Sequence, residues 1–452
     1  MPSAAKRRPP SRAAYLERWA SHEHPGTKRL TMIQIIRVLL ATVLLALASC
    51  SSPPRTGKPG QGAARFSDGG PNADEYGRQQ AYPVAAINRP KFFVGNFSHQ
   101  DQLTEVRLVR RADTPSPLAR ASVEPPISYQ HEGESRTIDD YLSRNATTGL
   151  LIARNNTILV ERYQYARHDR HRFVSASMAK TVTAMLLGIA VAEGKIRSID
   201  DPAGEYVPAL TNSEYGRTSL RHLLQMSSGV RFEENYGGAD DSLRLWLETV
   251  VQQGPGGAAA LRQFNQRHRW PGAVFSYSSA ETQVLGLVLA GATGRTVAGY
   301  LQEKIWGPMG AESDATWVID AAGQEATYCC LGAVLRDYAR LALLLAQDGR
   351  LGDRQVIPKA WLIEATTVPR DRPDLAHVWP DTGFGYGYQT WIFPGERRMF
   401  ALIGVHGQAI YVDPTSGLVL VHTAVRKEAS DANRETLALW RGILESLGNQ
   451  RN

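Results

Sequence analysis

Two polar residues stand at the start of a long apolar segment. Ser177 and Lys180 are three residues apart, and from Ser177 to Glu193 the chain contains no proline and a single glycine. Such a segment predicts a buried helix that ends where Gly194 follows. On that helix the hydroxyl and the amine share one face, about one turn apart.

A buried lysine beside a hydroxyl can act as a base. Burial disfavours the charged ammonium group, so the Lys180 side chain tends to lose its proton. The neutral amine can then take the proton of the Ser177 hydroxyl, which becomes a nucleophile for a carbonyl carbon. Because Ser-x-x-Lys also arises by chance on solvated helices, these four residues need support from the rest of the chain.

The surrounding segments predict an α+β fold. Residues 148–163 are two apolar runs around Arg-Asn-Asn, which favours a β-hairpin. A sheet packed between helical layers would accommodate this hairpin and the later segments. Those segments are a short helix capped by Thr218 and reaching residue 226, an apolar helix at 281–292, strands at 401–404 and 418–425, and a final helix at 434–447.

Residues 1–49 resemble an export signal. Lys28 and Arg29 precede an apolar segment at 33–48, and Leu47-Ala-Ser-Cys50 resembles a bacterial lipobox, in which the cysteine becomes the lipidated first residue. The stretch 50–75 is polar and rich in proline and glycine, so we expect it to be a tether. An uncleaved signal anchor is the alternative to lipidation.

The net charge of +7 lies in this leader. Residues 1–49 carry eight basic and two acidic residues, whereas the rest of the chain carries 43 basic and 42 acidic residues. A nearly neutral mature chain gives no support to nucleic-acid binding. We expect a lipid anchor at the periplasmic or cell-surface face of a bacterial membrane, and no obligate protein partner is evident. Met32 is an alternative start, which would make residues 1–31 an untranslated extension.

Residues 76–134 predict an N-terminal arm that packs on a main domain spanning 135–452. Prolines punctuate the arm, and its apolar runs at 92–94 and 106–109 favour short strands. The arm carries no motif that indicates chemistry.

The chain has three cysteines, of which Cys50 belongs to the lipobox. Cys329 and Cys330 are adjacent, and a disulfide between neighbours closes a strained ring. We expect two buried thiols that act as small apolar side chains, with a vicinal disulfide as the alternative in an oxidising compartment. No cysteine or histidine cluster has metal-ligand spacing, so neither a metal nor a cofactor is expected.

Further motifs follow the Ser177 helix in a fixed order. They are Asp200-Asp-Pro202, Leu223-Leu-Gln-Met-Ser-Ser-Gly229, Tyr277-Ser-Ser279 and His406-Gly407-Gln408. With Ser177-Met-Ala-Lys180, this set resembles the serine β-lactamase and penicillin-binding-protein superfamily over roughly residues 135–447. Within it, the set resembles the class C-like branch, which also holds esterases and 6-aminohexanoate-dimer hydrolases. The resemblance implies an antiparallel sheet flanked by helices, with a mostly helical subdomain.

The resemblance also implies roles for individual residues. Tyr277 would shuttle a proton to the leaving group, and the Ser177 N–H would form half of an oxyanion hole. The other half would be an N–H after His406-Gly407, at Gln408 or Ala409. Three further substrate-binding candidates are Tyr236 on a loop, Ser279, and His406 itself. Each of these has a plainer structural alternative, because loop aromatics and lone histidines are more often packing residues.

The departures from the family pattern narrow the substrate. His-Gly-Gln stands where β-lactamases have Lys-Thr-Gly, and Ser279 stands in place of an asparagine. A fixed cation for a substrate carboxylate is therefore missing. We expect a hydrolase of small linear amides or esters rather than an efficient β-lactamase. The alternatives are a carboxylesterase, a class C-like β-lactamase or D-peptidase, and a non-catalytic lipoprotein that binds peptide or peptidoglycan.

Overall fold

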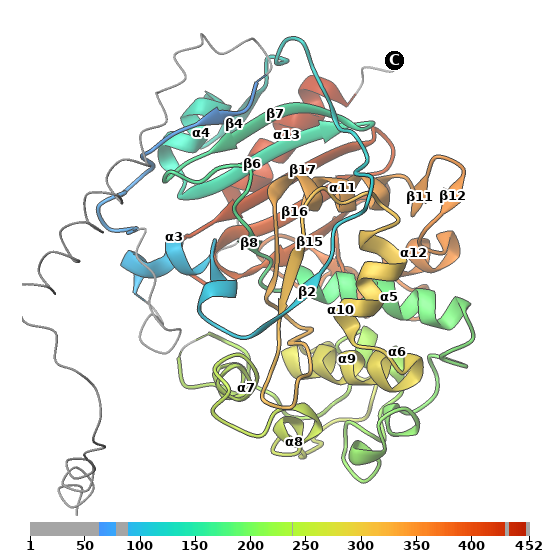
Figure 1. The fold of residues 1–452 in the computed structure, drawn as a ribbon. Coiled ribbons are helices and arrows are strands. Elements are labelled where there is room, and N and C mark those ends of the chain that lie inside the picture. Colours follow the sequence, from blue (N-terminus) through green and yellow to red (C-terminus); the bar gives the residue numbers. More distant parts are fainter. Residues whose placement is uncertain (1–62, 78–88, 237, 430–433, 449–452) are drawn as a thin grey trace, which may run out of the picture. The chain divides into compact units, whose positions relative to one another are not determined.

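The computed structural model describes residues 63–77, 89–236, 238–429 and 434–448. The expected export signal, Cys50 and the first part of the tether lie outside these ranges. The chain divides into residues 1–58 and 59–452, and every described residue belongs to the second unit. The centre of this unit is a β-sheet with helices on both faces (Figure 1).

The main sheet has the strand order β1-β7-β6-β17-β16-β15-β14-β13, and β3 also pairs with β7. Strands β7 to β13 of this series pair antiparallel, as expected for the main domain. The short β1, within the stretch expected to be a tether, and β3 of the arm lie parallel to β7. The strands are β1 (Arg65–Phe66), β3 (Ala119–Arg120), β6 (Thr147–Arg154), β7 (Thr157–Tyr163), β13 (Gly385–Tyr386), β14 (Trp391–Ile392), β15 (Phe400–Gly404), β16 (Gln408–Asp413) and β17 (Leu418–Ala424).

The hairpin expected at 148–163 is confirmed as β6 and β7. Its turn consists of Asn155 and Asn156, whose φ angles are 46° and 64°. Asparagine tolerates this left-handed conformation better than most residues, which is why Asn-Asn between two apolar runs makes a tight turn. The strands expected at 401–404 and 418–425 are confirmed as β15 and β17.

Alternate residues of the central strands face two different cores. Leu151 of β6 lies in the core covered by α5 and α11, and Leu150 lies in the core covered by α4 and α13. Successive side chains of a strand point to opposite faces, so a strand covered on both sides is apolar throughout. The covering helices are α4 (Ile138–Arg144), α5 (Met178–Ala192), α11 (Leu335–Ala346) and α13 (Arg434–Leu447), with α12 (Lys359–Ala365) packed against α5.

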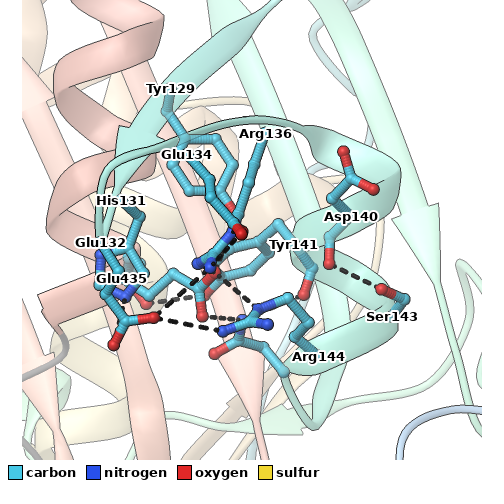
Figure 2. Close-up of polar contacts among 12 residues, drawn as sticks. Tyr129, His131, Glu132, Glu134, Arg136, Asp140, Tyr141, Ser143, Arg144 and Glu435 are labelled. Atoms are coloured by element: carbon cyan, nitrogen blue, oxygen red, sulfur yellow. Dashed lines mark hydrogen bonds and ion pairs between the residues drawn. The ribbon is translucent and has the colours of Figure 1, made fainter.

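Glu435 ties the C-terminal helix α13 to the β4–β5 hairpin and to α4 (Figure 2). Its carboxylate accepts hydrogen bonds from Tyr129 at 2.9 Å, Arg136 at 3.0 Å and Arg144 at 3.2 Å. Asn145 donates a fourth bond at 2.9 Å. Burial raises the pKa of Glu435, but the bonds from Asn145 and Tyr129 together with the charges of Arg144 and His131 outweigh this effect and leave the pKa below its ordinary value. The hairpin strands are β4 (Ser128–His131) and β5 (Glu134–Thr137).

A second group of helices lies below the sheet in Figure 1. Its centre is α9, the apolar helix expected at 281–292, which is buried over most of its length. The short helix expected with a Thr218 cap is capped instead by Ser219, whose hydroxyl accepts from the His222 N–H. The helices are α6 (Leu220–Leu224), α7 (Asp241–Thr249), α8 (Gly257–Leu261), α9 (Ser279–Thr293), α10 (Val297–Leu301) and the π-helical η7 (Gln302–Trp306).

Among the described residues, no single helix is long and apolar enough to cross a membrane. The helices α9 and α10 with η7 meet that test only as a pair, which is bent by 73°.

The N-terminal arm is helical at 92–94, where we expected a strand. The segment forms three single turns beside β8, which are η3 (Pro90–Phe92), α3 (Phe93–Asn96) and η4 (Gln100–Gln102). The expectation was wrong because an apolar run of three residues does not distinguish a helical turn from a strand. The strand expected at 106–109 is confirmed as β2. It belongs to a second sheet of order β2-β9-β10-β8, whose strands are β2 (Val106–Val109), β8 (Phe173–Val174), β9 (Ala315–Val318) and β10 (Leu331–Ala333).

Candidate active site

Ser177 stands at the amino end of α5, as the sequence predicts. The chain reaches it from β8 through Ala176, which has a φ of 43°. This left-handed conformation is unusual for a residue with a side chain, and such residues cluster at functional sites. The Ser177 N–H precedes the helix, so it has no acceptor within α5 and is available to a ligand.

Lys180 is buried one turn into α5, and three oxygen atoms surround its amine. The Nζ atom lies 3.0 Å from Ser177 Oγ, 3.0 Å from Ser279 Oγ and 3.0 Å from the Tyr328 carbonyl oxygen. Burial lowers the pKa of Lys180 to about 8, against a weaker opposing effect of the Glu234 carboxylate. A useful fraction of the amine is therefore neutral near physiological pH.

The neutral form of this amine has two N–H bonds and one lone pair. Ser279 Oγ donates its proton to Glu234 Oε1 at 2.7 Å, so toward Lys180 it can only accept. The Tyr328 carbonyl oxygen also accepts only. Both N–H bonds are then directed to these two oxygen atoms, and the lone pair is left for the proton of Ser177. This is the geometry of a base and its nucleophile.

Tyr277 lies beside this pair, immediately before α9. The Ser177 side chain is close enough to the Tyr277 hydroxyl to act on its pKa, which it lowers slightly, and Lys180 Nζ lies 5.0 Å from the centre of the Tyr277 ring. Burial raises the pKa of Tyr277 far above its ordinary value, and the nearby Glu234 carboxylate adds to the effect. The phenol is therefore protonated at neutral pH. Its ring stacks on Trp391 of β14 with centroids 5.6 Å apart, which fixes its orientation.

Glu234 is the residue whose part in the site our sequence reasoning missed. Its carboxylate accepts from the Ser279 N–H at 2.6 Å, at the start of α9, and from the hydroxyls of Ser279 and Tyr236. A carboxylate at a helix N-terminus is stabilised by the N–H groups there. The available signal was the spacing Glu234-Asn-Tyr236, from which we drew only the tyrosine as a loop residue. The structure makes Tyr236 a partner of Glu234 on the cavity wall, at 2.6 Å.

The end of β15 lies next to Ser177. A side chain at Gly404 would come within 2.9 Å of the Ser177 nitrogen and 2.7 Å of the Ser175 carbonyl oxygen, so only glycine fits there without a shift. Val405, the next residue, lines the same cavity as Ser177. The strand therefore ends where a second N–H donor for an oxyanion would be needed.

Gln408 and Ala409, from which we expected that donor, do not line the cavity. The chain turns at His406 and Gly407, which have φ angles of 60° and 90°. Gln408 and Ala409 follow this turn and belong to β16. Ala409 pairs with strands on both sides, so its N–H faces a neighbouring strand. The side-chain amide of Gln408 donates to the Ala424 carbonyl and accepts from the Ala424 N–H, so it is directed to β17. Gly407 also lies outside the cavity.

His406 lines the cavity, but its ring is held by the fold. Its Nδ1 lies 2.7 Å from the Arg426 carbonyl oxygen, which fixes the tautomer with the proton on Nδ1. Phe93 and Phe97 of the arm pack edge-on against the ring, with centroids 4.9 and 5.3 Å away. Burial lowers the pKa of His406, so the imidazole is neutral at physiological pH.

A cavity of about 260 Å³ opens beside Ser177. It brings together Ser177, Ser279, Tyr236 and His406 of the residues selected from the sequence, while Lys180 lies beneath Ser177. Within the described ranges, no group of three or more histidine, cysteine or acidic residues could hold a metal ion.

Cys329 and Cys330 form a vicinal disulfide on the wall of this cavity. We expected two buried thiols, so this expectation is wrong and the alternative holds in the structure. Cys330 has a φ of 67°, and Tyr328, whose carbonyl oxygen accepts from Lys180, directly precedes the pair. The disulfide therefore borders both the cavity and one of the three contacts of the amine.

The ordered motifs, the sheet between helical layers and the Ser177–Lys180–Tyr277 cluster correspond to a known family. The β-lactamase family model matches residues 135–441. This chain belongs to the β-lactamase family. As a member of it, the chain is a serine hydrolase of β-lactamase fold.

Similar proteins include hydrolases and penicillin-binding proteins. A 6-aminohexanoate-dimer hydrolase of Paenarthrobacter ureafaciens is 27% identical over 297 residues, which are 63% of this chain and 74% of that protein. The solved structure of a proposed 6-aminohexanoate-dimer hydrolase from Bacillus anthracis has a TM-score of 0.73 at 22% identity and covers 84% of this chain and 100% of its own. A penicillin-binding protein from Bacillus halodurans has a TM-score of 0.52 at 18% identity, covering 66% of this chain and 97% of its own. These structures share the fold.

Proposed function

We propose that this member of the β-lactamase family cleaves small linear amides or esters through an acyl-enzyme on Ser177. The observation that carries the proposal is the set of contacts around Lys180. Ser279 and the Tyr328 carbonyl take the two N–H bonds of the neutral amine, which leaves its lone pair for the Ser177 hydroxyl.

In the proposed reaction, Ser177 Oγ bonds to the substrate carbonyl carbon while Lys180 Nζ takes the hydroxyl proton. Tyr277 is protonated and lies beside Ser177, so it can donate a proton to the leaving amine or alcohol as the bond to the carbonyl carbon breaks. The Lys180 ammonium returns a proton to Tyr277. Water then attacks the acyl carbon while Lys180 Nζ takes one of its protons. As the bond from that carbon to Ser177 Oγ breaks, the Lys180 ammonium returns the proton to Oγ and the acid is released.

The tetrahedral intermediate carries a negative oxygen that needs two donors. We assign one to the Ser177 N–H at the start of α5. We place the second at Val405 rather than at Gln408 or Ala409, because Val405 lines the cavity with Ser177 and follows Gly404, which abuts the Ser177 nitrogen.

An amide substrate is supported by the relative that is named for the 6-aminohexanoate dimer, whose units are joined by an amide bond. The same acyl-enzyme would serve an ester. A β-lactamase or D-peptidase activity is less well supported, because no lysine or arginine is among the described residues that line the cavity. A purely binding role is also less well supported, because Ser177, Lys180 and Tyr277 are arranged for reaction.

We also propose that the protein is exported and lipid-anchored at Cys50, on the periplasmic or cell-surface face of a bacterial membrane. The leader and the Leu47–Cys50 motif support this location. The Cys329–Cys330 disulfide is consistent with an oxidising compartment.

A fluorophosphonate probe tests the nucleophile. We expect intact-mass analysis of the full-length protein to show one covalent adduct, which Ser177→Ala abolishes and Lys180→Ala slows by about 100-fold or more. Ser143→Ala and Lys359→Ala are matched controls, since both residues are exposed and distant in sequence from the motif. They should be labelled like the parent.

The absence of an adduct on folded parent protein would overturn the hydrolase mechanism and favour the binding alternative. An adduct that persists in Ser177→Ala would place the nucleophile elsewhere. Circular dichroism of each variant confirms that it is folded.

A further inference from the structure

The N-terminal arm builds one wall of the cavity, although it precedes the part of the chain that the family model matches. Its contribution is apolar side chains with two neutral amides, from Phe93, Asn96, Phe97, Gln100 and Leu103. The arm is held close to the nucleophile, because the Phe97 carbonyl accepts from the Val174 N–H at 2.9 Å, three residues before Ser177. Figure 1 shows α3 beside β8.

Other residues that line the cavity are also apolar. Leu243 and Trp246 come from α7, and the Cys329–Cys330 disulfide follows Tyr328. A disulfide has no strong hydrogen-bonding group, so it adds apolar surface to the wall. The cavity of about 260 Å³ has roughly twice the size of an apolar cavity that holds one benzene molecule.

The charges on the lining of this cavity are negative or neutralised, and Lys180 lies beneath Ser177 rather than on the lining. Glu234 and Asp240 are the acidic residues on the described lining, and no lysine or arginine is part of it. Glu234 is bound by Ser279 and Tyr236, and Asp240 accepts from backbone N–H groups of its own loop. His406 is neutral, because burial lowers its pKa.

A substrate carboxylate in such a cavity would lose its hydration without gaining a cation. The two carboxylates on the wall would also repel it. An uncharged apolar chain meets none of these costs and gains from burial against the aromatic side chains.

We propose that this cavity binds an uncharged, apolar chain of an ester or amide and discriminates against chains that end in a carboxylate. The inference rests on the proposed acyl-enzyme mechanism and adds the substrate class to it. The arm residue Phe97 contributes to the binding of the apolar chain, so the arm is a determinant of specificity.

Matched substrate pairs test the charge preference. On the acyl side, p-nitrophenyl hexanoate is compared with the p-nitrophenyl monoester of adipic acid. On the leaving-group side, hexyl acetate is compared with 6-acetoxyhexanoate. In at least one pair we expect kcat/KM of the uncharged substrate to exceed that of the carboxylate by about tenfold or more, mainly through KM.

Gln100→Arg tests the cause of the discrimination. The carbonyl oxygen of the Gln100 side chain is buried without a hydrogen-bond partner, so the substitution breaks no bond of that atom. A cation at this position should attract the substrate carboxylate, and so lower the ratio of kcat/KM for the uncharged substrate to kcat/KM for the carboxylate by about tenfold. Gln102→Arg adds the same charge in the same turn at a position that does not line the cavity, and it should leave the ratio unchanged.

Phe97→Ala tests the arm, with Phe92→Ala as the matched control. Phe92 is in the same segment but does not line the cavity. Phe97→Ala should raise KM for p-nitrophenyl hexanoate more than KM for p-nitrophenyl acetate, whereas Phe92→Ala should leave both KM values unchanged.

Equal kcat/KM within both pairs would overturn the proposed substrate class. That outcome would leave the mechanism intact as long as turnover still depends on Ser177. Absence of turnover and of fluorophosphonate labelling would instead overturn the proposed function itself.

Discussion

The protonation of Lys180 is set by its surroundings in the fold. Its amine is buried, so the neutral form is favoured, and its pKa is lowered to about 8. Glu234 works in the opposite direction, because its negative charge stabilises the ammonium. The proton balance at Ser177 is therefore set jointly by burial and by one carboxylate.

The pH dependence of acylation should report this balance. Neutral Lys180 is the reactive form in the proposed mechanism, so kcat/KM should rise about tenfold per pH unit below 8 and level off above it. Glu234→Gln removes the charge that raises the Lys180 pKa, so the rise should move to lower pH. Glu233→Gln, which changes the exposed neighbouring carboxylate, should leave the profile in place. A profile that Glu234→Gln does not move would contradict the coupling.

The loss of activity on substitution of Tyr277 should depend on whether the leaving group needs a proton. A protonated phenol is needed when an amine departs, whereas p-nitrophenolate departs without a proton. Tyr277→Phe should therefore reduce kcat for an anilide by about 100-fold or more, and reduce kcat for a p-nitrophenyl ester much less. Equal losses on both substrates would indicate that the tyrosine only orients Ser177.

At the scale of elements, the end of β15 must approach the start of α5 closely. Gly404 allows this approach, because its backbone lies against Ser175 and the Ser177 nitrogen. The apolar strand and the helix N-terminus together form the surroundings of the proposed oxyanion hole.

Gly404→Ala should therefore impair catalysis. The new Cβ would lie 2.7 Å from the Ser175 carbonyl oxygen, so the strand or the helix start must shift. We expect a fall in kcat of about 100-fold with a smaller change in KM. Gly69→Ala is the control, since nothing lies within 4 Å of a Cβ there. Unchanged kcat in Gly404→Ala would remove this strand end from the reaction.

Glu435 should stabilise the packing of α13. Its pKa is below the ordinary value in the fold, so its contribution is present above the unfolded pKa and is lost as the pH falls through the folded pKa. Glu435→Gln should lower the free energy of unfolding at pH 7 by about 1–3 kcal/mol. The difference from the parent in urea unfolding should shrink as the pH falls below about 4. Glu445→Gln, on the exposed side of the same helix, should have little effect.

At the scale of the whole molecule, the arm completes both sheets. β3 extends the main sheet along β7, to which the short β1 that precedes the arm also pairs, and β2 pairs with β9 in the second sheet. The arm also closes the cavity. Main-chain pairing and apolar contacts therefore join this segment to the domain that the family model matches.

A truncation series tests this dependence. A chain that starts at residue 63 should keep its Tm and its rate of fluorophosphonate labelling. A chain that starts at residue 135 should have a Tm lower by 5 °C or more, roughly, because it loses strand pairing and apolar burial, and it should be labelled more slowly. Equal Tm values and labelling rates for the two chains would make the arm an accessory segment.

Local sequence was sufficient for features whose parts are close along the chain. The Asn155-Asn156 turn and the run from Ser177 to Glu193 predicted the hairpin and the helix, because each pattern is set by neighbouring residues. The helix 434–447 was also predicted with the observed bounds. The family motifs added Tyr277, although its contact with Ser177 spans 100 positions.

Other parts of the site depend on contacts that no local pattern encodes. Lys180 meets a hydroxyl 99 positions away and a carbonyl 148 positions away, and a backbone carbonyl leaves no mark in residue types. The turn at His406 and Gly407 decides that Val405, rather than Gln408 or Ala409, lines the cavity. Likewise, the arm revealed no chemistry until folding placed Phe93 and Phe97 against His406.

The sequence by itself determined the family and the pair proposed as nucleophile and base, because helical spacing and ordered motifs are properties of the chain. The tertiary structure decided that the lone pair of Lys180 is directed to Ser177, which residue ends the strand beside it, and which segment closes the cavity. Those properties arise only when distant segments pack together, since burial and hydrogen-bond partners are set by the folded neighbours rather than by the residue itself.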